Sequence, residues 1–135
     1  MIDKHKFFIC AHCGNLVGMI ENAGVPMICC GEKMRELIPN MVDAAKEKHV
    51  PKITREGGKL FVEVGEVAHP MTEAHHIAWI AVMQENSTGR ITLSSTAEPR
   101  AEFCVTEGSA AVYAYCNLHG LWAKEASDCY KTHGN

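Results

Sequence analysis

Short runs of hydrophobic residues, separated by turn-forming residues, make up most of the chain. In residues 59–64, KLFVEV, hydrophobic and polar positions alternate, so Leu60, Val62 and Val64 lie on one face of a predicted strand. The run 75–84, HHIAWIAVMQ, is apolar on both faces, which is typical of a central strand of a sandwich. Short strands divided by turns such as EGGK and ENSTG predict an all-β fold built on a β-sandwich. Further strand candidates are residues 89–95, 101–107 and 110–116.

The pattern changes near Pro39. Before it, short strand-sized runs (6–10 and 15–20) alternate with tight turns, in a segment too small to bury much apolar surface. After it comes a polar, charged stretch, in which residues 41–49 have some helical propensity that Pro51 ends. We therefore expect two domains, 1–38 and 39–135.

Composition narrows the class of protein. Apolar residues make up 47% of the 135 residues, enough for a buried core, and the net charge of −3 gives no electrostatic reason to expect a nucleic acid or an acidic membrane as partner. The longest apolar run, IAWIAVM, is too short to span a bilayer, and the first residues lack a secretory signal. We expect a soluble, cytoplasmic protein. Seven cysteines and eight histidines in such a chain point to metal binding, because a reducing compartment disfavours disulfides.

Four cysteines crowd into the N-terminal domain. A CxxC turn followed by Gly14 lets two thiolates face one ion, and an adjacent pair can close a tetrahedral site with four sulfur ligands, because Gly31 gives the backbone freedom to turn. Such a site suits zinc or iron. The alternative is disulfides or a redox-active CxxC. The four residues are Cys10, Cys13, Cys29 and Cys30.

A second set of metal-ligand residues lies at strand ends in the larger domain. Loops cluster at the ends of a sandwich, so these residues can converge on one ion. Adjacent residues of a strand point to opposite faces, so only one of His75 and His76 is expected to face it, and the pattern does not choose between them. The set is His49, His69, His75 or His76, Cys116 and His119.

The motifs CAHCGN, CC, EKHVP, HPM, HxIxWI and CNLHGLW together resemble desulfoferrodoxin, the two-iron form of superoxide reductase, from about Phe7 to Trp122. The resemblance implies a desulforedoxin-like N-terminal domain with iron on Cys10, Cys13, Cys29 and Cys30. It implies an immunoglobulin-like sandwich with a catalytic iron, held by four equatorial histidines and an axial cysteine, and it selects His75 over His76. The implied ligands of that iron are His49, His69, His75, His119 and Cys116.

The same resemblance implies a function. Superoxide would be reduced by one electron to hydrogen peroxide, with no dioxygen formed, in a homodimer supplied with electrons by rubredoxin or a similar carrier. Lys48 would attract the superoxide anion, and Glu47 would occupy the sixth position of the oxidised iron and leave on reduction. Two rival interpretations are a superoxide dismutase, which the thiolate ligand disfavours, and a colourless zinc module without catalysis.

Residues outside the ligand sets carry simpler expectations. The backbone N–H groups of Asn117 and Leu118 are expected to donate to the Cys116 sulfur. Cys104 is interpreted as a small buried side chain, and Trp79 and Trp122 as core or interface residues. The C-terminal tail, with Cys129 and His133, is expected to be solvated and without a role.

Overall fold

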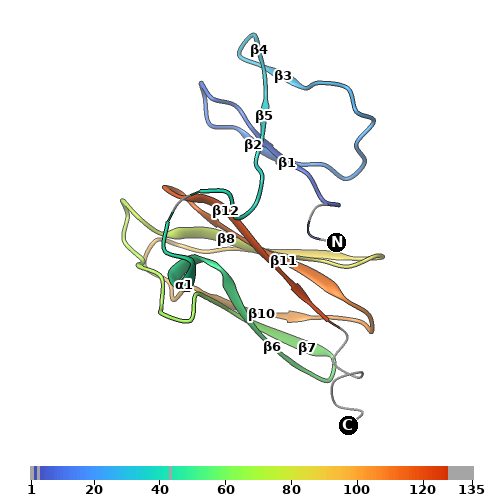
Figure 1. Cartoon of the computed structure of the whole chain (residues 1–135), viewed down its shortest axis with the longest axis vertical. Coiled ribbons are helices and arrows are strands. Elements are labelled where there is room, and N and C mark those ends of the chain that lie inside the picture. The colour runs from blue at the N-terminus through green and yellow to red at the C-terminus, as the bar shows by residue number, and fades with distance from the viewer. Residues whose placement is uncertain (1, 3, 43, 128–135) are drawn as a thin grey trace. The chain divides into compact units, whose positions relative to one another are not determined.

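A computed structural model describes residues 2, 4–42 and 44–127 (Figure 1). The chain divides into two compact units, one of residues 3–38 and one of residues 1–2 and 39–135. Cys129 and His133 lie outside the described residues. Within the described part of the chain, no helix combines the length and the hydrophobicity needed to cross a membrane.

The described residues of the larger unit form two antiparallel sheets that enclose one core. One sheet has the order β10-β7-β6 and the other the order β12-β11-β8-β9. Leu60 and Val62 of the first sheet and Ile80 and Val112 of the second belong to a single buried cluster, which confirms the predicted all-β sandwich (Figure 1). The strands are β6 (Pro51–Glu56), β7 (Lys59–Val64), β8 (Ile77–Met83), β9 (Thr88–Thr92), β10 (Arg100–Cys104), β11 (Ala110–Cys116) and β12 (Gly120–Ala126).

The hydrophobic pattern agrees with the observed burial. In β7, Leu60, Val62 and Val64 are buried and the intervening positions are not. β8 lies between β11 and β9, as expected for a central strand, and four of its seven residues are buried. Its pairing with β11 is irregular, since Tyr115 faces Trp79 whereas Cys116 faces Ile77. A bulge of this kind re-aims side chains at the end of a strand, which here is the end nearest His75 and His76.

Three expectations need correction. β8 begins at Ile77, so His75 and His76 precede the strand and the alternation argument does not apply to them. The helical propensity of residues 41–49 yields only one turn, α1 (Lys46–His49), because no side chain caps its start and Val50 is already extended. Cys104 is exposed, because it follows the buried Phe103 and so lies on the outer face of the edge strand β10.

The smaller unit is built from very short strands. β1 (Phe7–Ile9) lies between β2 (Leu16–Gly18) and β5 (Arg35–Glu36), and β3 (Ile28–Cys29) pairs with β4 (Glu32–Lys33). Among its described residues the buried hydrophobic side chains are those of Phe7, Cys10 and Met34. A core this small cannot offset the conformational entropy lost by ordering the segment, so the unit requires a further source of stability.

Candidate metal centres

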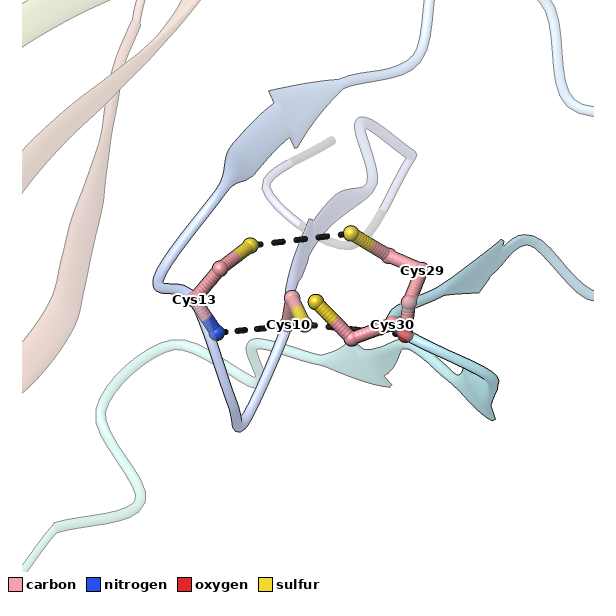
Figure 2. A group of neighbouring side chains, drawn as sticks. All are labelled: Cys10, Cys13, Cys29 and Cys30. Atoms are coloured by element: carbon pink, nitrogen blue, oxygen red, sulfur yellow. Dashed lines mark hydrogen bonds between the residues drawn. The ribbon is translucent and has the colours of Figure 1, made fainter.

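The four cysteines of the smaller unit meet in one group, with their sulfur atoms all within 4.8 Å of one another (Figure 2). The Sγ atoms of Cys13 and Cys29 are 3.6 Å apart. Two local turns bring the pairs together: Gly14 has φ +82° after the CxxC segment, and Cys30 and Gly31 have φ +53° and +76°. The left-handed backbone at Cys30 itself lets Cys29 and Cys30 face the same centre. The sequence analysis attributed this freedom of the backbone to Gly31 alone.

The environment of these sulfurs favours a cation. Backbone N–H groups of Cys13 and His12 lower the pKa of Cys10 to about 6, which makes it a thiolate at neutral pH. The neighbouring Cys10 and Cys13 side chains raise the pKa of Cys30 to about 12, and neighbouring thiols also raise that of Cys29. Four thiolates therefore coexist here only when a positive ion offsets their repulsion. The donor set fits iron or zinc.

At one end of the sandwich, four imidazole rings form a closed, square-like circuit. The ring centroids of His49 and His69 are 4.6 Å apart, those of His69 and His75 are 4.7 Å apart, those of His75 and His119 are 5.0 Å apart, and those of His119 and His49 are 4.9 Å apart. His49 and His75, on a diagonal, are 6.3 Å apart. This arrangement allows one nitrogen from each ring to face a common centre.

Hydrogen bonds to backbone carbonyls engage one nitrogen of two of the rings and leave the other nitrogen for an ion. Nδ1 of His49 lies 2.7 Å from the Ala45 carbonyl oxygen, and Nδ1 of His69 lies 2.7 Å from that of Pro70, so both rings direct Nε2 inward. His119 instead directs Nδ1 inward, 3.2 Å from Nε2 of His49. Nε2 of His69 and Nε2 of His75 are buried without a hydrogen-bond partner, which is costly unless an ion occupies the centre.

A sulfur joins the circuit from the end of β11. The ligand atoms of His49, His75, Cys116 and His119 lie within 4.8 Å of one another. Burial raises the pKa of the Cys116 thiol, and the N–H groups of His119, 3.4 Å from the sulfur, and of Leu118 offset part of that rise. Asn117, expected to donate to the sulfur, donates its N–H to the His76 carbonyl oxygen instead, because the chain still follows the β8–β11 pairing at this point.

Burial also sets the protonation of the rings. Desolvation lowers the pKa of His49 and His75, and it lowers that of His69 to about 4. The imidazoles of His49, His69 and His75 are therefore neutral near pH 7, as metal binding requires. The buried, unpartnered nitrogens and the deprotonated rings show that these side chains fit a transition metal ion.

A tight turn separates the roles of His75 and His76. The backbone groups of Thr72 and His75 exchange hydrogen bonds of 2.9 and 3.2 Å. From this turn His75 enters the circuit, whereas Nδ1 of His76 lies 2.9 Å from the Thr72 carbonyl oxygen. The structure thus places His75, the histidine that the resemblance selected, in the circuit and leaves His76 outside it.

Trp122 contributes to the site in a way that the sequence analysis missed. Its buried indole stacks on His49, with ring centroids 4.8 Å apart, and its Nε1–H donates to the His119 carbonyl oxygen at 3.1 Å. The available signal was its position three residues after His119.

Glu47 and Lys48 lie on α1, directly before His49, and both are exposed. The positive charge of Lys48 contributes to the lowered pKa of His49 and of His75, so it lies within electrostatic reach of both rings. The backbone carbonyl of Glu47 accepts a hydrogen bond of 3.0 Å from the N–H of Val67.

Comparison with known proteins identifies the family of the chain. The family model described as desulfoferrodoxin matches residues 41–125. The chain belongs to the desulfoferrodoxin family. The desulfoferrodoxin homolog of Archaeoglobus fulgidus is 43% identical over 90% of this chain and 98% of its own length, and the desulfoferrodoxin of Nitratidesulfovibrio vulgaris is 40% identical over 93% and 100%. The crystal structure of the superoxide reductase from Treponema pallidum superposes with a TM-score of 0.73 at 35% identity, covering 90% of this chain and 98% of that one. Both metal centres therefore lie in a segment shared with full-length relatives.

Proposed function

We propose that the chain is a superoxide reductase that detoxifies superoxide. One superoxide anion, one electron and two protons give one hydrogen peroxide, and no dioxygen forms. The observation that carries this proposal is the circuit of four imidazoles with a cysteine sulfur beside it, in a chain of the desulfoferrodoxin family.

The proposed ligands are the residues of the two groups together with His69, whose ring completes the circuit. Cys10, Cys13, Cys29 and Cys30 hold the N-terminal iron. The catalytic iron would be held by Nε2 of the inward-facing rings, by Nδ1 of His119 and by the Cys116 thiolate. The three rings that supply Nε2 are those of His49, His69 and His75. Iron bound in this set supplies the electron for superoxide.

The protein's own groups then handle charge and protons. The N–H groups of His119 and Leu118 face the Cys116 sulfur and oppose the rise in its pKa that burial causes, so they favour the thiolate that would bind the iron. The Lys48 ammonium attracts the superoxide anion toward the imidazole circuit and stabilises negative charge on the reduced dioxygen unit until protons arrive from solvent. Glu47 lies on the same exposed turn, and its carboxylate would be a further, reversible ligand for the iron.

The test of the function is a stoichiometry. Superoxide generated by pulse radiolysis is added to the reduced, iron-loaded protein, and peroxide and dioxygen are measured. A reductase gives one peroxide per superoxide and no dioxygen, whereas a dismutase gives one peroxide and one dioxygen per two superoxide ions. A colourless protein that holds two zinc ions and consumes no superoxide would overturn the proposal in favour of a structural zinc module.

We further propose a homodimer that receives its electrons from a rubredoxin-like carrier in the cytoplasm. Support for the dimer comes from exposed hydrophobic side chains on the smaller unit, with Ile20 fully exposed and Val25 and Ile28 exposed by 70% and 65%. Support for a reducing compartment comes from the six described cysteines, none of which forms a disulfide. Light scattering tests the dimer, and reduction of the oxidised protein by reduced rubredoxin tests the donor.

A further inference from the structure

The residue after the axial cysteine connects two segments that carry metal ligands. Asn117 is exposed, so its side chain is not held by packing. Its side-chain Oδ1 accepts the N–H of His76 at 2.8 Å, and its Nδ2 donates to the Ala74 carbonyl oxygen at 3.0 Å. Its backbone N–H donates to the His76 carbonyl oxygen at 3.1 Å. Three hydrogen bonds from one residue thus join the Cys116–His119 segment to the turn that carries His75.

The geometry explains why these bonds need a side chain. Residues 116 and 77 pair in the β8–β11 ladder, so residues 117 and 76 are the next pair. In an antiparallel pair of this kind, each residue's N–H normally donates to the other's backbone carbonyl. Here the His76 N–H finds the side-chain oxygen of Asn117 in place of its backbone oxygen. The Asn117 backbone is therefore free to leave the sheet and turn toward His119.

We propose that Asn117 is a positioning residue of the catalytic metal centre, which holds His75 at the correct distance from Cys116 and His119. This inference rests on the proposed function, because it concerns the same site. An asparagine suits the role because one short amide both accepts and donates, whereas aspartate only accepts at neutral pH.

The test compares metal retention at the two centres of the same chain. The iron-loaded Asn117→Ala variant is exposed to a chelator, and loss of iron from each centre is followed through its own thiolate-to-iron absorption band. We expect iron to leave the catalytic centre about 10-fold faster than in the unmodified protein, the lower end of the effect of removing a group that orients metal ligands. Loss from the four-cysteine centre should not change.

Gln84→Ala is the matched control. The buried Gln84 amide makes the same two-way contact with backbone, donating to the Thr106 carbonyl oxygen at 2.9 Å and accepting the Thr106 N–H at 3.1 Å, at the other end of β8. It should lower stability without changing iron loss from the catalytic centre. Asn117→Asp, which keeps the acceptor and loses the donor, should lie between alanine and asparagine.

Equal iron loss from Asn117→Ala and the unmodified protein, or equally accelerated loss from Gln84→Ala, would overturn the inference. If the alanine variant does not accumulate as folded protein, the aspartate variant is compared with Gln84→Ala in the same way. The readout of this experiment is metal loss, so its result does not depend on whether the unmodified protein consumes superoxide. Superoxide consumption tests the proposed function separately.

Discussion

Lys48 is the charge that we propose attracts superoxide, and its ammonium contributes to the lowered pKa of two rings of the circuit. We expect Lys48→Ile to slow the second-order reaction with superoxide by about 10-fold, since an anion no longer meets a cation at the site. Both irons should remain bound. Pulse radiolysis measures the rate, and metal analysis measures the occupancy.

Lys46→Ile is the control for this variant. Lys46 lies on the same helical turn and is also exposed, but it is not among the charges that shift the pKa of the rings. Its removal alters the net charge equally and should change the rate by less than about twofold. If both variants slow the reaction equally, the effect belongs to the overall charge of the protein and Lys48 has no specific role.

His69 links the site to acid stability. Burial holds its pKa near 4, below the 6.5 of an exposed histidine, so below about pH 6.5 the unfolded chain binds a proton that the folded, metal-free chain does not. The free energy of unfolding of the metal-free protein should therefore fall as the pH is lowered from about 6.5 to about 4. Denaturant titrations at several pH values measure this slope. In a His69→Gln variant, the free energy of unfolding should depend less steeply on pH. An unchanged slope would show that His69 is not the source of this pH dependence.

At the scale of single residues, the sequence predicted which residues form the metal sites but not which contacts position each side chain. The choice of His75 over His76 came from a resemblance. The alternation argument assumed that the strand includes both histidines, but the strand begins only at Ile77. The positions of Asn117 and Trp122 depend on where β11 leaves the sheet and on which rings lie nearby. Both are tertiary facts that no local pattern contains.

Among the elements, the turn after β7 determines where α1 lies. Gly65 has φ +85°, and a Cβ there would lie 2.5 Å from the Val67 oxygen, 2.6 Å from the Glu47 oxygen and 2.7 Å from the Lys48 carbonyl carbon. All three are backbone atoms that cannot rotate away. We expect Gly65→Ala to displace the turn that carries Lys48, and so to slow the superoxide reaction at least 10-fold and lower the melting temperature.

Gly57→Ala separates this clash from the general cost of a side chain in the left-handed region. Gly57 has φ +59°, but a Cβ there meets no atom within 4 Å. It should cost about 1 kcal/mol of stability and leave the superoxide rate unchanged. Equal rates in the two alanine variants would show that the packing of Gly65 does not position Lys48.

The elements also show what the hydrophobic pattern can predict. Alternation in β7 and continuous hydrophobicity in β8 each reflect burial on one or both faces, so both strands were predicted from local sequence. The bulge opposite Cys116 and the single turn of α1 depend on pairing and packing between distant segments. Helical propensity over residues 41–49 therefore overestimated the helix.

For the molecule as a whole, the two units differ in what stabilises them. The larger unit has a continuous core that joins both sheets, whereas the described part of the smaller unit buries two hydrophobic side chains, Phe7 and Met34, besides Cys10. Metal binding to the four thiolates is therefore expected to supply the folding free energy of residues 3–38, as in other small metal-dependent domains. Metal binding would thus explain how a segment with so small a core can fold.

Removal of both metals should then unfold one unit only. After reduction and chelation, amide hydrogen exchange should become fast across residues 4–38 and stay slow in β8 and β11, where the core is fully buried. Adding zinc, which also accepts four thiolates, should restore protection in the smaller unit without electron transfer. Cys13→Ser should resemble the chelated protein in this region even when metal is present. Slow exchange in residues 4–38 of the metal-free protein would show that the small core suffices, and the four-cysteine centre would then have to be explained by electron transfer.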